Sequence, residues 1–137
     1  MSFLEYIKTK FRVVVVDTEF QSDVSNTYCT KALCAVYKDL STGQTLKIWD
    51  YGQRNMAQHH FDFEKTMFVC HYANAEVGYF LNMLMGRPPY VFDCWTELAK
   101  LYKGRWPELS LLAAARAYEF PHPTSKEEKE YFRDMCI

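Results

Sequence analysis

The sequence lacks an apolar run that approaches the roughly 20 residues needed by a membrane-spanning helix. It also lacks an N-terminal apolar segment followed by a small-residue cleavage site, so no secretory signal is predicted. The cysteines form neither Cys-x-x-Cys pairs nor zinc-type spacings with histidine. The five residues concerned are Cys29, Cys34, Cys70, Cys94 and Cys136. We therefore expect a cytoplasmic protein with reduced thiols and no membrane partner.

A surplus of positive charge is missing as well, because the formal net charge is −1 at pH 7. A protein that holds nucleic acid through a broad basic surface needs many more cations than anions. Any contact with nucleic acid is therefore expected to be local, metal-assisted or supplied by a larger assembly.

What the sequence does contain is 49% apolar and 17% aromatic residues, which excludes a disordered chain. Its 137 residues suffice for one packed domain, predicted over residues 1–137. The apolar patterns predict an antiparallel meander followed by alternating strands and helices, which is an α/β fold with a mixed sheet. Turns or irregular connections are predicted at 21–31 and 52–63. Strands are predicted at 13–16, 32–37, 45–49, 67–70 and 90–92, and helices at 73–84, 94–102, 111–118 and from Ser125 onward.

The most informative stretch is the run of four valines at 13–16, which predicts a fully buried strand. Asp17 and Glu19 follow it, and side chains two residues apart on a strand project from the same face. Two neighbouring carboxylates repel one another unless a cation lies between them, and a divalent metal ion is the natural candidate. The alternative is that the strand ends in a polar turn where both carboxylates are solvated.

Glu76 is the further acidic residue expected near this place. It falls in the first turn of the helix predicted after the strand at 67–70. If that strand lies parallel to the first and beside it, the helix begins near Asp17. The alternative is that Glu76 only supplies favourable negative charge at a helix N-terminus.

The order of the elements is that of RNase H-like domains, and several segments resemble the 3′–5′ exonuclease domain of bacteriophage DNA polymerases related to family A. Those domains belong to the DEDD, or DnaQ-like, exonucleases. The resemblance covers nearly the whole chain from about Phe11 onward and implies an RNase H-like mixed sheet flanked by helices. The segments that carry it lie at 13–20, 68–81, 91–98, 111–120 and 129–137.

By this likeness Asp17, Glu19 and Glu76 are catalytic carboxylates and metal ligands, with Glu76 where most of the superfamily has aspartate. Mg²⁺ or Mn²⁺ suits such oxygen ligands, and two ions in the complete site activate water and stabilise the in-line transition state at phosphorus. The expected partner is the 3′ end of single-stranded DNA. The residues implied to contact substrate are Thr18, Phe20, His71 and Tyr72.

Alternatives stay open for the residues around the acids. Packing or hydrogen bonding is the alternative for His71, and core packing is the alternative for Phe20. Asp93, at the end of the strand at 90–92, resembles a recurring family aspartate that supports the site without binding metal.

The chain departs from the family pattern at its end. The last metal-binding acid of the family comes from a Tyr-x-x-x-Asp or His-x-x-x-x-Asp motif on a late helix, and this sequence has no such motif. The segment ending Arg133-Asp134-Met-Cys-Ile resembles the stretch just before it. We therefore expect a C-terminally incomplete domain without the fourth carboxylate and general base, with the remaining polymerase polypeptide as a candidate partner.

Three functions follow from these observations. The first is a metal-dependent 3′–5′ exonuclease of the proofreading type in a phage-type DNA polymerase. The second is a catalytically silent or split module of the same fold that binds nucleic acid or a polymerase partner, which the missing acid favours. The third is a ribonuclease of the same fold, because metal–phosphate chemistry does not by itself distinguish DNA from RNA.

Overall fold

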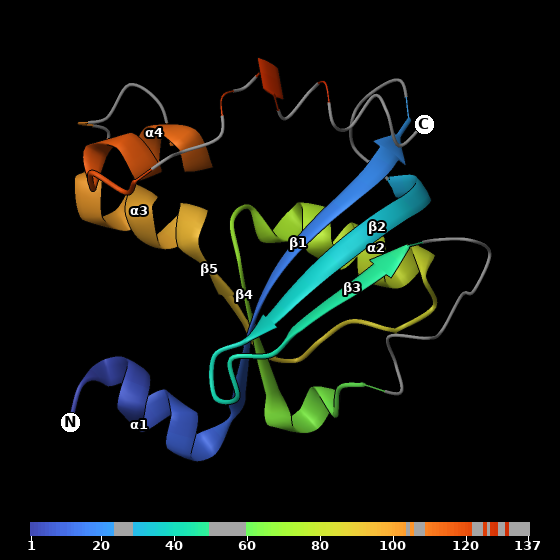
Figure 1. The fold of residues 1–137 in the computed structure, drawn as a ribbon, viewed down its shortest axis with the longest axis horizontal. Helices are drawn as coiled ribbons and strands as arrows, with labels where there is room; N and C mark the ends of the chain where they lie inside the picture. The colour runs from blue at the N-terminus through green and yellow to red at the C-terminus, as the bar shows by residue number, and fades with distance from the viewer. Residues whose placement is uncertain are drawn as a thin grey trace. The chain divides into compact units, whose positions relative to one another are not determined.

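The computed structural model describes residues 1–23, 29–49, 60–103, 105, 109–121, 125, 127–128 and 131. The chain divides into two compact units, Met1–Asp93 and Cys94–Ile137. The first unit contains a five-stranded sheet, and the described part of the second includes helices α3 and α4 (Figure 1). Within the described ranges, no helix is long and apolar enough to cross a membrane.

The sheet is mixed and has the strand order β3-β2-β1-β4-β5. Its central strand β1 (Arg12–Ser22) pairs antiparallel with β2 (Cys29–Asp39), which pairs antiparallel with β3 (Thr45–Trp49). On its other side β1 pairs in parallel with β4 (Thr66–Cys70), and β4 pairs in parallel with β5 (Val91–Asp93). The predicted meander followed by parallel strands is therefore confirmed.

Helix α2 (Ala73–Asn82) connects β4 to β5 and covers one face of the sheet, because its apolar side chains pack on the central strands. Phe80 of α2 lies against Phe68 of β4, with ring centroids 5.1 Å apart. Both rings are almost fully buried, and burying a side chain of this size contributes about 1.5–3 kcal/mol. The short 3₁₀ helix η2 (Phe63–Lys65) precedes β4 and adds Phe63 to this core.

Helix α1 (Phe3–Lys10) lies at the N-terminus and was not among the predicted elements. Its start is fixed by a capping box, in which the Glu5 N–H donates to Ser2 Oγ and the Ser2 N–H donates to Glu5 Oε2. The tetrapeptide Ser2-x-x-Glu5 is a sequence signature of this arrangement, so the signal was present in the chain. No residue of α1 is buried, which is why no strong apolar period marks it.

The second unit contains α3 (Cys94–Tyr102) and α4 (Leu111–Ala117). Ser110 caps α4 as predicted, because its hydroxyl accepts the N–H of Ala113. The capping box predicted at the start of the last helix is also present, since Ser125 and Glu128 exchange backbone-to-side-chain hydrogen bonds of 2.9 and 3.1 Å.

Two predictions about the first strands are wrong. The valine run is not fully buried, because Val15 is 36% exposed and points away from α2. The strands are also longer than predicted, since the ladder continues from Val14 to a Ser22–Cys29 pair and includes part of the predicted turn at 21–31. Backbone hydrogen bonds between β1 and β2, rather than apolar composition, hold the polar ends of both strands in the sheet. Residues 24–28, and most of the connection predicted at 52–63, lie outside the described residues.

Candidate active site

Alternate residues of β1 face opposite sides of the sheet. Val14, Val16 and Thr18 are buried on the side that α2 covers. Asp17 is exposed and Glu19 is half-buried on the other side, which we call the open face. Two positions along a strand span about 6.7 Å, so both carboxylates project from one surface at neighbouring positions. The predicted pairing of Asp17 and Glu19 on one face therefore agrees with the alternation of burial along β1, although both lie within the strand rather than at its end.

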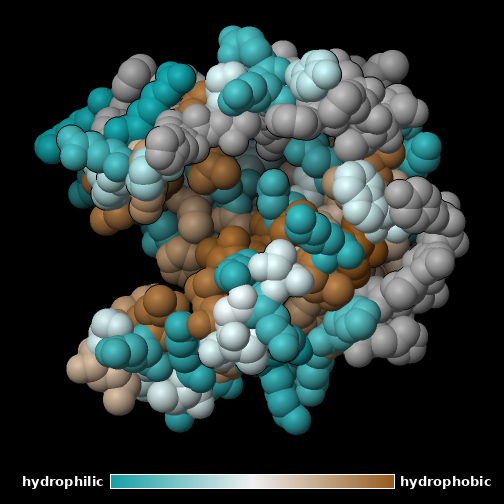
Figure 2. Space-filling view, viewed as in Figure 1, coloured by the Kyte–Doolittle hydropathy of each residue, from teal (hydrophilic) through white to brown (hydrophobic). Residues whose placement is uncertain are grey.

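The register of the sheet places two rows of side chains across the open face. Asp17 lies opposite Val36 on β2, and Val36 lies opposite Lys47 on β3. Figure 2 looks onto β1, β2 and β3 from this side and shows hydrophobic residues gathered among hydrophilic ones. The surface around the acids is therefore partly apolar, with Val36 39% exposed.

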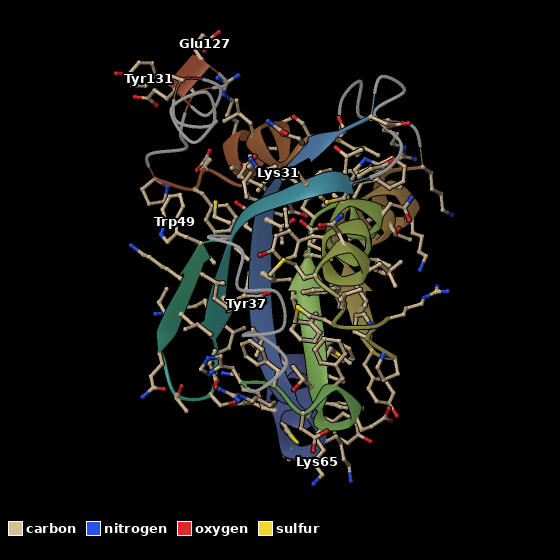
Figure 3. All side chains as sticks on the ribbon, turned by 90° about the vertical axis from the view of Figure 1, so that its right-hand side faces the viewer. Lys31, Tyr37, Trp49, Lys65, Glu127 and Tyr131 are labelled. Carbon is tan, nitrogen blue, oxygen red and sulfur yellow. The ribbon has the colours of Figure 1, made fainter. Side chains whose placement is uncertain are left out.

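The second row runs from Glu19 through Cys34 to Trp49 at the end of β3. Trp49 is 47% exposed, and Figure 3 shows it on the side of the sheet away from α2. Sequence reasoning missed Trp49 as a candidate site residue. The signal was the alternation from Thr45 to Trp49, whose apolar positions Leu46 and Ile48 leave Trp49 on the exposed side.

A β-bulge lies directly beside the acids. The register changes from Glu19 opposite Cys34 to Phe20 opposite Ala32, so Leu33 is an extra residue on β2. Bulges bend a strand and increase its twist, and they are common next to active sites because they re-aim side chains. The bulge therefore bends β2 directly beside Glu19.

The turn from β4 into α2 is strained. Tyr72 has φ 72° and ψ 70°, a left-handed conformation that costs a non-glycine residue about 1–2 kcal/mol. The N–H of Tyr72 donates to Asp93 Oδ1 at 2.8 Å, so the end of β5 holds the turn. Such backbone outliers concentrate at functional sites. Tyr72 itself is 50% exposed, and His71 beside it is half-buried.

Glu76 lies in the first turn of α2, after the strand that runs parallel to β1, as predicted. Its side chain is only 4% exposed, in contrast to that of Asp17. Over the part of the chain that the structure describes, no three His, Cys, Asp or Glu residues are grouped so that they could hold a metal ion. The structure thus brings together Asp17 and Glu19, and it does not add Glu76 to them.

The remaining expected substrate residues differ in position. Thr18 is 7% exposed on the side of α2, where its hydroxyl is buried without a hydrogen-bond partner. Phe20 packs against the core cluster, which agrees with the alternative of core packing. Neither side chain shares the surface of Asp17, so any contact of Thr18 with substrate would run through its backbone.

The carboxylate pair fits a hard divalent cation in its donor chemistry. Carboxylate oxygens are the ligands that Mg²⁺ and Mn²⁺ prefer, and these ions usually keep several bound waters. The exposure of Asp17 leaves room for such waters. A third protein ligand is not supplied by the arrangement of the described residues.

Comparison with known proteins gives a likeness of fold. No protein-family model matches the sequence, and no curated protein matches it. Escherichia coli RNase D, described as an exoribonuclease involved in structured RNA processing, matches with a TM-score of 0.58 and 17% identity over 93% of this chain. A structure described as the apo form of a nuclease matches with a TM-score of 0.65 and 13% identity, also over 93% of this chain.

This chain spans 36% of the RNase D chain and 61% of the other nuclease chain. With the strand order β3-β2-β1-β4-β5, these likenesses confirm the predicted fold class, an α/β fold with an RNase H-like mixed sheet.

Proposed function

We propose that this chain is a metal-dependent 3′–5′ exonuclease module that hydrolyses the terminal phosphodiester of a single-stranded nucleic acid. A fold hosts many functions, so the proposal depends on the site and not on the fold alone. The observation that carries it is the Asp17–Glu19 pair on the open face of the central strand. Two like charges at adjacent positions of an otherwise partly apolar surface favour a bound cation.

Asp17 and Glu19 are the residues that would hold the metal, while Glu76, the expected third ligand, is not grouped with them in the described part of the chain. When bound, divalent ions lower the pKa of the attacking water and stabilise charge on the phosphoryl group in the transition state. The strained Tyr72 turn, held by Asp93, positions the start of α2 and with it the backbone of Glu76.

Two exposed aromatic side chains are suited to hold the bases of a single strand. Trp49 lies in the same row as Glu19, two strands away, which corresponds to about 10 Å. Tyr72 lies in the turn before Glu76. Stacking of a base on an aromatic side chain contributes about 1–3 kcal/mol and tolerates any base. This supports binding without a broad basic surface, in agreement with the net charge of −1.

The finer assignment is proofreading of DNA. It is supported by the resemblance of the sequence to the exonuclease domains of phage-type DNA polymerases. A ribonuclease is the second candidate, because one of the structures with this fold is described as an exoribonuclease involved in structured RNA processing.

A catalytically silent nucleic-acid-binding module is the third candidate. It is favoured by the absence of the Tyr-x-x-x-Asp or His-x-x-x-x-Asp motif from the 137 residues. Loss of a general base slows catalysis by about 10²–10⁴-fold, so we expect the 137-residue chain by itself to trim slowly at most.

The test is release of the terminal nucleotide from 3′-labelled single-stranded DNA and RNA of one sequence, with Mg²⁺, with Mn²⁺ and with chelator. The chain offers a matched control, because Asp62 and Glu64 form a second Asp-x-Glu tripeptide, exposed and on a 3₁₀ helix instead of a strand. Asp17→Ala/Glu19→Ala is therefore compared with Asp62→Ala/Glu64→Ala after the melting temperature of each variant has been measured.

Metal-dependent trimming that only the first double variant loses would support the exonuclease, and the preferred strand would decide between DNA and RNA. Binding of oligonucleotide without trimming would support the silent module. Trimming that survives in the Asp17→Ala/Glu19→Ala variant would contradict the proposed site.

A further inference from the structure

The start of β2 lies beside the carboxylate pair and belongs to an irregular part of the sheet. The pairing of β1 with β2 changes register twice beyond Glu19. The described pairing of β2 with β3 ends at Cys34, so residues 29–32 lie beyond it. Where a ladder is disrupted, a backbone group that loses its strand partner must pair with another group or it destabilises the fold. Side chains are therefore expected to help hold residues 29–32.

Asn82, the last residue of α2, makes three hydrogen bonds to this segment. Its Oδ1 accepts the N–H of Ala32, and its Nδ2 donates to the backbone oxygens of Cys29 and Thr30, each at 3.3 Å. The hydroxyl of Thr30 also donates to the backbone oxygen of Gln21 at 3.0 Å. A primary amide has an acceptor oxygen and two N–H donors, and Asn82 uses both kinds of group here. The end of α2 thereby holds the start of β2.

Gly78 lies one turn before Asn82 and faces the same segment. A Cβ placed on Gly78 would lie 3.6 Å from the Cβ of Cys29, which is an ordinary contact distance. Residues four positions apart lie on the same face of a helix. This face of α2 therefore lies close to the start of β2, and an alanine fits at position 78 without disturbing it.

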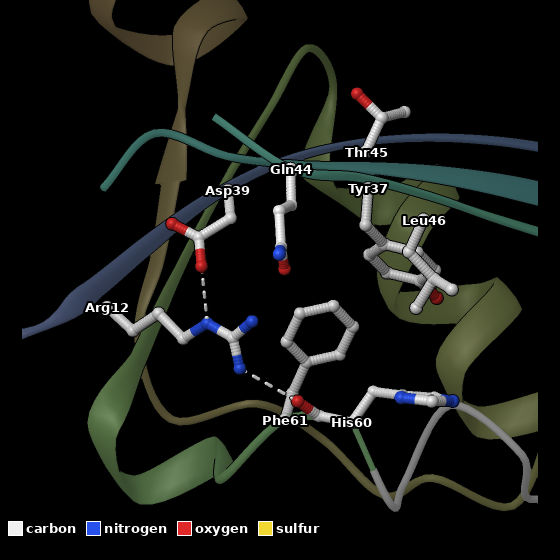
Figure 4. A pocket seen from close by; sticks show the side chains of 8 residues that line it. All are labelled: Arg12, Tyr37, Asp39, Gln44, Thr45, Leu46, His60 and Phe61. Atoms are coloured by element: carbon white, nitrogen blue, oxygen red, sulfur yellow. Dashed lines mark hydrogen bonds and ion pairs between the residues drawn. The ribbon is translucent and has the colours of Figure 1, made fainter. Parts of the chain in front are cut away.

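The other end of the ladder between β1 and β2 is held by an ion pair. Arg12 Nε donates to Asp39 Oδ2 at 2.8 Å, and Arg12 Nη1 donates to the backbone oxygen of His60 at 2.8 Å (Figure 4). Burial raises the pKa of Asp39, but the hydrogen bonds from Arg12 and from the N–H groups of Ser41 and Thr42 outweigh it and hold the pKa below its usual value. Asp39 is therefore charged near neutral pH. The carboxylate pair lies between this ion pair and the segment that Asn82 holds.

The hydrogen bonds of Asn82 lie close to Glu19 along the ladder. Glu19 is the last residue of β1 before the first change of register, and its partner is Cys34. Only the bulged Leu33 separates Cys34 from Ala32, whose N–H is held by Asn82. A bulge increases the local twist and re-aims the side chains beside it. The orientation of the Glu19 carboxylate therefore depends on a bulge that Asn82 holds from the side of α2.

We propose that Asn82 is a positioning residue for the carboxylate pair, acting through the bulged segment of β2 and not through contact with the metal ion. This inference rests on the proposed metal site at Asp17 and Glu19. A binding site functions only when its ligands are held within about 0.5 Å of the productive geometry. Groups that bond directly to a metal ligand typically change metal affinity by about 10–100-fold when they are replaced. Asn82 acts through the backbone, so we expect a smaller loss of about three- to tenfold.

The test is a Mn²⁺ titration followed by paramagnetic broadening of backbone amide signals, on the wild type, Asn82→Ala and Gly78→Ala. In the metal-free protein Asn82→Ala should shift the amide signals of Ala32, Cys34 and Glu19. It should then bind Mn²⁺ about three- to tenfold more weakly than the wild type. Gly78→Ala is the matched control, because it changes the same face of α2 and leaves the three hydrogen bonds in place. It should keep the Mn²⁺ affinity and raise the melting temperature, since alanine favours a helix over glycine.

A second control separates positioning from a general loss of stability. Ile48→Val removes one methylene group from the core and lowers the melting temperature by another route, so it should keep the Mn²⁺ affinity of the wild type. Unchanged affinity in Asn82→Ala, or an equal loss in Ile48→Val or Gly78→Ala, would overturn the proposal. Fast hydrogen exchange of the Ala32 amide in the wild type would overturn it as well, because that amide would then lack the bond to Asn82. A wild type that binds no Mn²⁺ would contradict the proposed metal site itself, and this inference with it.

Discussion

Replacing Asp17 with asparagine should stabilise the metal-free protein. Asp17 and Glu19 project from the same face of β1 about 6.7 Å apart. Two unit charges at that distance repel by about 0.6 kcal/mol in water, and screening at physiological salt reduces this to about 0.3 kcal/mol. Glu19 is half-buried, which lowers the effective dielectric constant and raises the repulsion to about 1 kcal/mol at low salt. Asp17→Asn removes this repulsion with almost no change in shape.

The assay is urea unfolding of the wild type and of Asp17→Asn at about 10 mM and about 1 M salt, where the Debye length is about 30 and 3 Å. The gain in the free energy of unfolding should be largest at low salt and should disappear at high salt. Asp62→Asn is the control, since Asp62 belongs to the other Asp-x-Glu tripeptide and caps η2 instead of facing a second strand carboxylate. It should show no such gain.

Mn²⁺ should reverse the order of stability. A ligand at ten times its dissociation constant stabilises the folded state by about 1.4 kcal/mol, and only the wild type keeps both proposed ligands. The wild type is therefore expected to be the more stable protein in Mn²⁺ and the less stable one in chelator. The reasoning is refuted if Asp17→Asn is clearly less stable without metal, or if both proteins gain equally from Mn²⁺.

Three further predictions concern the surroundings of the site. Asp93→Ala should lower the free energy of unfolding, measured with urea, by about 1–2 kcal/mol, because the Tyr72 N–H loses its acceptor. Asp93→Asn keeps an acceptor oxygen and should lower the free energy of unfolding by less. Equal decreases in the two variants would argue against the hydrogen bond. The pKa of Asp39 lies below its usual 3.8 in the folded state. The stability that the Asp39 carboxylate contributes is therefore complete above pH 3.8 and is lost as the pH falls through the folded-state pKa. Asp39→Asn should remove this part of the acid unfolding transition followed by circular dichroism. Trp49→Ala should weaken binding of a labelled single-stranded oligonucleotide by about 1–3 kcal/mol in fluorescence anisotropy, while Trp95→Ala, at a 37% exposed tryptophan in the other unit, should not.

Much of the fold could be predicted because short apolar runs and helical periods are local signals. The strand Thr45–Trp49 and the helix Cys94–Tyr102 have the bounds that the sequence predicts. The extent of β1 and β2 could not be predicted in this way, because their polar ends are held by the ladder between the strands, and a bulge at Leu33 shifts the register. The exposure of Val15 could not be predicted either, since a run of four valines does not reveal that one face of the strand is exposed to solvent.

The candidate site was predictable in part for a related reason. The shared face of Asp17 and Glu19 follows from the two-residue period of a strand alone. The burial of Glu76 depends instead on how α2 packs on the sheet, which is a tertiary property. The left-handed conformation of Tyr72 is held by a hydrogen bond to Asp93, which is 21 positions away in the sequence, so no local sequence pattern predicts it.

The central claim is that Asp17 and Glu19 bind a divalent metal ion on the open face. Its most direct test is a Mn²⁺ titration followed by paramagnetic broadening of backbone amide signals, on the wild type and on the two double variants Asp17→Ala/Glu19→Ala and Asp62→Ala/Glu64→Ala. We predict that substoichiometric Mn²⁺ broadens the signals of β1 around Asp17 and Glu19 and those of the facing residues of β2 around Val36. This pattern should persist when Asp62 and Glu64 are replaced and vanish when Asp17 and Glu19 are replaced. Broadening that is the same in all three proteins, or that centres on other acidic residues, would contradict the account.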